Sequence, residues 1–170
     1  MTDGKKIMEL NEQIRKIEVG GIEHANDLRD VRNGLLDELA ELVDIKTNEN
    51  IYGDVDIQIE GVDFIKGERN FEIMLQTDES TGFYTPFWPQ NASYKILSDG
   101  SREYNIDGAE VFDLKREISS DKNTDIGGLK AILLARGDHR ADYTDIEKDY
   151  GSVSESVVMN IQAEFDQLIH

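Results

Sequence analysis

Hydrophobic side chains recur at helical spacing near both ends of the chain. Apolar residues three or four positions apart share one face of an α-helix. This pattern predicts helices over residues 5–19 and 25–43, and a last helix from the capping sequence at 152–155 to the final residue. Glycines at 20 and 21 end the first helix, so we expect the first two helices to fold back antiparallel. The predicted helix-packing seams consist of Ile7, Leu10, Ile14 and Ile17, then Leu28, Val31, Leu35, Leu39 and Leu42, and finally Ile161, Phe165 and Leu168.

Between residues 46 and 123 the apolar residues instead alternate with polar ones. In 55–59 every second residue is apolar, as in a strand that buries one face. Asp99-Gly100 separates two alternating runs within 93–106, which is typical of a β-hairpin. Short turns between consecutive strands favour an antiparallel sheet. Helical spacing returns in 124–137, where a glycine closes the segment.

These elements predict an α+β fold. A Leu or Ile side chain left in water forgoes roughly 1.5–3 kcal/mol, so each seam needs a cover. The nearest covers are the other seams of the same chain. We therefore expect an antiparallel helical layer built from residues 1–45 and 124–170, with an inserted antiparallel β-rich lobe over 46–123. Because helical signals run to the last residue, we also expect the chain to be a piece of a longer protein.

One aromatic segment, residues 82–90, stands apart from these patterns. It holds Phe83, Tyr84, Phe87 and Trp88 beside the two prolines of the chain, which favours a loop or a sheet edge. Two interpretations remain open. The aromatic side chains fill a small core under the sheet, or they form an exposed contact patch for a neighbouring subunit.

The chain of 170 residues carries a formal net charge of −18 and no cysteine. Such acidity repels phosphate backbones and anionic lipid surfaces, so we expect neither nucleic-acid nor membrane binding. No apolar run approaches the roughly 20 residues of a membrane-spanning helix. The lack of cysteine excludes disulfides and cysteine zinc sites.

The sequence contains no recognisable set of catalytic residues. Its histidines, at 24, 139 and 170, have no metal-ligand neighbour at helical spacing. The acidic segment 137–149 lacks the frame and glycine of a calcium loop. No phosphate-binding loop, dinucleotide fingerprint or nucleophile elbow occurs. We expect a protein that is not an enzyme and needs no cofactor or metal.

Two stretches of the chain stand out, "LNEQIRKIE" at 10–18 and "ANDLRDVRNGLLDELAELVDI" at 25–45. Both resemble the central region of the flagellar hook-associated protein 1 family, the hook–filament junction proteins. Further along, "IGGLKAILLARGD" at 126–138 is similar to the Gly-Gly-Leu segment of that family, and "AEFDQLI" at 163–169 to the start of its next long helix. The terminal heptad segments of the family, which form the axial tube, have no counterpart in this sequence.

The resemblance implies a structural role in the bacterial flagellum. The parent protein would be exported through the growing flagellum and would form a ring of copies between hook and filament. Its partners there would be the hook protein and the adjacent junction protein. The isolated chain, without axial segments, is expected to be a monomer.

Two other functions fit parts of the sequence. Another flagellar axial protein, such as flagellin or hook protein, also combines helices with a β insert. A secreted carbohydrate-binding module or hydrolase would use the sheet and Trp88 as a sugar platform.

Overall fold

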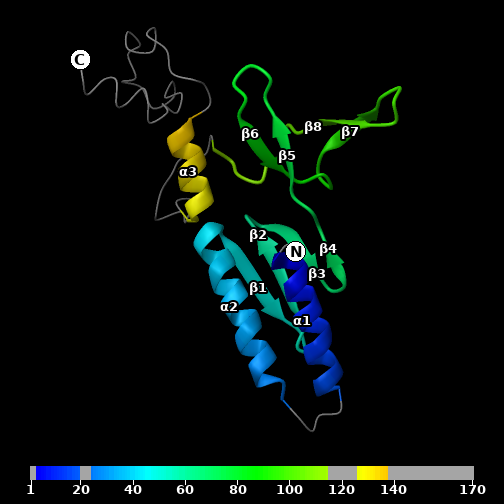
Figure 1. Ribbon diagram of the computed structural model, residues 1–170, viewed down its shortest axis with the longest axis vertical. Coiled ribbons are helices and arrows are strands. Elements are labelled where there is room, and N and C mark those ends of the chain that lie inside the picture. Colours follow the sequence, from blue (N-terminus) through cyan, green and yellow to red (C-terminus); the bar gives the residue numbers. More distant parts are fainter. Residues whose placement is uncertain (1–2, 20–23, 115–125, 138–170) are drawn as a thin grey trace, which may run out of the picture. The chain divides into compact units, whose positions relative to one another are not determined.

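The fold is α+β, as expected, and is seen here in a computed structural model that describes residues 3–19, 24–114 and 126–137 (Figure 1). The helices are α1 (Asp3–Glu18), α2 (Asn26–Leu42) and α3 (Gly128–Arg136). The strands are β1 (Ile45–Glu49), β2 (Val55–Ile59), β3 (Val62–Lys66), β4 (Arg69–Asn70), β5 (Met74–Thr77), β6 (Tyr84–Phe87), β7 (Ser93–Ile96) and β8 (Arg102–Asn105).

The first four strands form one antiparallel sheet in the order β1-β2-β3-β4. Strands β2 and β3 are joined at Glu60-Gly61, where both residues have positive φ, as the mirror-image turns of tight hairpins require. Strands β5 and β6 pair with each other, and so do β7 and β8. The expected hairpin at Asp99-Gly100 is confirmed, because Tyr94 of β7 lies opposite Tyr104 of β8.

The main core lies where α1 and α2 pack on the sheet β1–β4. The two helices run side by side along this sheet (Figure 1). Alternate residues of β2 are buried, as the period of two predicts. The core consists of Ile7, Val55, Ile57 and Ile65, with Met8, Leu35, Leu36, Leu39, Ile45 and Phe64 packed around them.

The core includes residues on both sides of position 45, because the apolar face of β2 is covered by α1 and α2. By their internal contacts, residues 1–76 with 85–112 form one unit and residues 77–84 with 113–170 another. The expected helical layer from residues 1–45 and 124–170, with an inserted lobe over 46–123, stays a prediction.

A smaller core in the first unit surrounds Trp88, which is 0% exposed. Its ring lies 6.4 Å from that of Phe64, and its backbone N–H donates to the carbonyl of Ala109. Phe87 is also buried, at 2% exposed, and its ring centroid lies 5.2 Å from that of Tyr104. Phe87 and Trp88 therefore fill a small core, which is the first of the two interpretations of residues 82–90.

The other two aromatic residues of that segment lie in the second unit. Phe83 is half-buried and stacks under the guanidinium of Arg136, whose carbon lies 4.6 Å from the ring centroid. Tyr84 is exposed. Its role in contact with another subunit stays a prediction.

Replacing Trp88 with Ala should lower the free energy of unfolding by about 3–5 kcal/mol, because a large side chain is lost from a filled interior. Tyr84→Ala is the matched control. It should change stability by about 0.5 kcal/mol or less, because the side chain is exposed. Urea denaturation followed by circular dichroism measures both, and equal stability of the two variants would contradict the packing.

Candidate functional site

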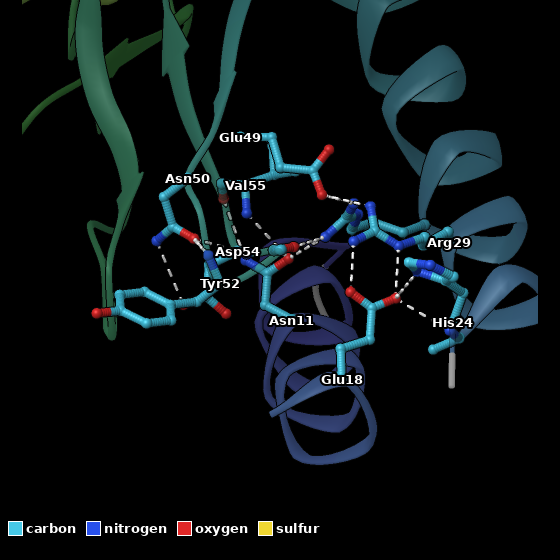
Figure 2. A network of polar contacts seen from close by, with 12 residues as sticks. Asn11, Glu18, His24, Arg29, Glu49, Asn50, Tyr52, Asp54 and Val55 are labelled. Carbon is cyan, nitrogen blue, oxygen red and sulfur yellow. Dashed lines mark hydrogen bonds and ion pairs between the residues drawn. The ribbon is translucent and has the colours of Figure 1, made fainter. Parts of the chain in front are cut away.

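A network of polar side chains fastens α1 and α2 to the turn between β1 and β2 (Figure 2). We call it the polar lock. Its members lie far apart in the sequence, and several are buried where hydrophobic side chains are the rule. The polar lock consists of Asn11, Arg15 and Glu18 of α1, Arg29 and Arg32 of α2, and Glu49, Asn50, Gly53, Asp54 and Val55 of the hairpin.

Arg32 is the centre of the polar lock and is 1% exposed. Its Nη1 donates to the side-chain oxygen of Asn11 at 3.0 Å and to the backbone carbonyl of Gly53. Its Nη2 donates to the carboxylate of Glu49 at 3.3 Å. A buried charge is stable only when such partners surround it. One side chain of α2 thereby holds both α1 and the hairpin.

Asn11 joins α1 to the start of β2. Its amide nitrogen donates to the carbonyl of Val55 at 3.1 Å, and its oxygen accepts the backbone N–H of Val55 at 3.3 Å. The side chain thus satisfies both backbone groups of one residue, as a neighbouring strand would. This pairing fixes the position of α1 along β2.

The turn between β1 and β2 is shaped by Asn50 and Gly53. The side-chain oxygen of Asn50 accepts the backbone N–H groups of Tyr52 and Asp54, at 2.8 and 3.1 Å. Gly53 has a φ of +82°, and a Cβ there would lie 2.9 Å from Nη2 of Arg29. The backbone angle therefore requires glycine, and a Cβ would also displace the guanidinium of Arg29.

Two arginines extend the polar lock toward its edge. Arg29 donates twice to Glu18, at 2.9 and 2.6 Å, and once more to Glu49. Arg15 bridges the nearly buried Asp54 at 3.0 Å and the exposed Glu68 at 3.1 Å. Guanidinium groups bind carboxylates in this forked manner with good geometry, which holds the helices in register.

The electrostatics of the polar lock are clearest at Glu18. Hydrogen bonds from Arg29, and then from the backbone N–H of Ala25, lower the pKa of Glu18 from its ordinary 4.5 to about 2. Hydrogen bonding to Glu18 is also the main reason that the pKa of Arg29 is raised. Glu18 therefore stays ionised at neutral pH and, from the end of α1, accepts hydrogen bonds from Ala25 and Arg29 at the start of α2.

The predicted seam residues divide into three groups. Ile7 and Ile14 are buried, and Leu10, Leu28, Leu35 and Leu39 are half-buried. Ile17, Val31 and Leu42 are exposed. Ile161, Phe165 and Leu168 lie outside the described residues.

On α2 the buried stripe is rotated relative to the expected one. Val31 is 57% exposed, whereas its neighbour Arg32 is buried. Sequence reasoning missed Arg32 because it assigns arginine to the solvent. The signal was its spacing, four residues after Leu28 and four before Leu36, which places it on the apolar stripe.

In the part of the chain that the structure describes, no group of three or more His, Cys, Asp or Glu residues is placed to hold a metal ion. His24 is exposed, and its Nδ1 lies 4.0 Å from the carboxylate of Glu18. His139 and His170 fall outside the described ranges. Within those same ranges no helix has the length and apolar character needed to cross a membrane.

The charged groups of the polar lock bond to one another and hold the helices and the hairpin of one α+β module together. A family model described as the flagellar hook-associated protein FlgK helical domain matches residues 2–158. The chain belongs to this family of structural proteins of the bacterial flagellum, an extracellular appendage. A search of curated proteins found no match.

The Arg32→Ala variant should lose about 3 kcal/mol of unfolding free energy. The carbonyl of Gly53 and the oxygen of Asn11 would lose a buried donor, and each such loss costs about 1–3 kcal/mol. Arg69→Ala removes an exposed arginine of β4 and should change stability by about 0.5 kcal/mol or less. Chemical denaturation of both variants tests this, and a near-neutral Arg32→Ala would refute the central role of Arg32.

Acidification should destabilise the protein through Glu18. Its pKa is lower in the folded state, so its contribution is complete above pH 4.5 and is lost as pH falls toward about 2. Glu18→Gln should therefore flatten the decline of unfolding free energy with pH in this range. Glu38→Gln, on the exposed side of α2, controls for the removal of one negative charge. An unchanged slope in Glu18→Gln would contradict the assignment.

Proposed function

We propose that this chain is part of a hook–filament junction protein, which is built into the flagellum as a ring of copies and has no catalytic activity. The observation that carries the proposal is the family match over residues 2–158. Proteins of this family are axial components that assemble with other flagellar proteins. The junction role is the finer step, and the resemblance of residues 10–18 and 25–45 to junction proteins supports it.

The polar lock suits a part that bears mechanical load. Its members Arg15 and Asn11 make bonds that span 39 to 53 positions of the sequence, from Arg15 to Asp54 and to Glu68, and from Asn11 to Val55. A load on α1 is thus passed directly to the sheet and not only along the chain. Buried polar networks also penalise shifted arrangements, since a slip leaves a charge or carbonyl without its partner.

The partners follow from the same role. Copies of the chain would lie beside each other in the ring, with the hook protein and the adjacent junction protein on either side. The protein would reach this place by export through the flagellar secretion channel. The net charge of −18 makes copies repel each other in dilute solution, so the isolated chain should be a monomer.

The carbohydrate-binding alternative loses its main support, because Trp88 is interior and offers no exposed platform. Another axial protein remains the competing function. Flagellin would be found along the whole filament, and hook protein along the whole hook.

Gold-labelled antibodies raised against the chain should separate these functions on flagella isolated from cells that produce the protein. A narrow band where hook meets filament is expected. Label along the filament or along the hook would instead assign flagellin or hook protein, and absence of label would reject the flagellar location. Flagella from cells that lack the gene provide the control.

A further inference from the structure

The turn between β1 and β2 presents two apolar side chains to solvent. Ile51 is 91% exposed and Tyr52 60% exposed. Figure 2 shows the side chain of Tyr52 pointing away from the polar lock. The flanking residues Asn50 and Gly53 are uncharged, so residues 50–53 form a neutral tip on a strongly acidic protein. We call Ile51 and Tyr52 the turn knob.

The backbone beneath the turn knob is held on several sides. Asn50 accepts the N–H of Tyr52, and the N–H of Gly53 donates to the carbonyl of Asn50 at 3.1 Å. The buried Arg32 donates to the carbonyl of Gly53. A prearranged turn loses little conformational freedom when it binds, and exposed Tyr side chains often dominate protein contacts. The rigidity therefore favours the turn knob as a contact element.

The same unit carries a cleft of about 430 Å³ along α1 and the β3–β4 turn, which we call the α1 cleft. Its lining includes Lys5, Met8, Glu9, Glu12 and Gly67. A thioether packs well on aromatic rings, and an ammonium group is attracted to their faces. Glu9 offers an acceptor for a phenolic hydroxyl, whereas Glu12 is paired with Lys16 at 2.6 Å. The chemistry of the lining thus fits a tyrosine side chain.

Charge disfavours an acidic occupant of the α1 cleft. The lining holds the carboxylates of Glu9, Glu12, Asp54 and Glu68, against two cations, Lys5 and Arg15. An acidic segment of another copy would be repelled there, and each copy carries a net charge of −18. The turn knob brings no charge, so it allows two copies to meet in spite of their net charge.

We infer that the turn knob of one copy docks in the α1 cleft of the next copy. The inference rests on the proposed function, which places copies side by side in a ring. Because knob and cleft are different surfaces of the same unit, the contact is head-to-tail, and contacts of this type generate rings when the rotation closes. Each copy therefore inserts its turn knob into one neighbour and receives the turn knob of the other neighbour in its own α1 cleft.

The chain has no cysteine, so introduced cysteines report the contact. Cells that produce Ile51→Cys copies and Glu68→Cys copies with different epitope tags yield flagella for treatment with a short bismaleimide cross-linker, and both variants keep Tyr52 and Glu9. A covalent product that carries both tags should form severalfold more than in the control pair, Ile51→Cys with Asp37→Cys on the exposed side of α2. Urea midpoints of all variants should match the parent, because the replaced side chains are exposed.

The outcomes separate the docking from the proposed function. A gold band at the hook–filament boundary without excess Ile51–Glu68 product overturns the docking and leaves the junction role. A dominant Ile51–Ile51 product also overturns it, because the interface would then be symmetric. Excess Ile51–Glu68 product in a concentrated solution of the purified variants, with no gold label on flagella, supports the docking and rejects the junction role.

Discussion

The structure of the first unit depends on one buried guanidinium. Arg32 lies where α1, α2 and the β1–β2 hairpin converge, and its charge is acceptable there only because each of its neighbours supplies an acceptor. Hydrophobic contacts tolerate a range of offsets between a helix and a sheet. A buried arginine does not, since any shift removes a partner from the charge. Hydrophobic burial brings the layers together, and Arg32 selects the register.

The bonds that fix this register also fix the turn between β1 and β2. Gly53 places its carbonyl toward Arg32, and Asn50 fixes the residues between them, so the turn points Ile51 and Tyr52 outward. Exposing an isoleucine is unfavourable in a monomer. The polar lock keeps the turn in this state by bonds that a relaxed turn would lose. The same few residues therefore stabilise the interior and keep Ile51 and Tyr52 exposed.

Local signals in the sequence predicted most elements of the fold, and non-local contacts account for what they missed. The hairpin at Asp99-Gly100 and the alternation of β2 are properties of neighbouring residues, so both were predictable. The packing of β2 on α1 and α2 depends on residues that lie far apart in the sequence, and periodicity contains no such information. For the same reason the aromatic segment kept two interpretations. The pairing of Phe87 with Glu110 and the bond from Trp88 to Ala109 place it, and both are distant contacts.

The polar lock was harder to predict than the fold, because its residue types normally mark a surface. Arg32 and Asn11 each occupy a position on an apolar stripe, and only this coincidence of polarity and spacing distinguishes them from solvent-facing neighbours. Their chemistry also explains where the polar lock resists salt. Nη1 of Arg32 bonds the neutral dipoles of Asn11 and Gly53 inside the protein, where mobile ions do not reach. The Arg15–Glu68 pair at the edge is open to screening. A protein outside the cell meets changing ionic strength. When salt weakens the Arg15–Glu68 pair, the buried bonds of Arg32 to Asn11 and Gly53 still hold the helices and the hairpin in register.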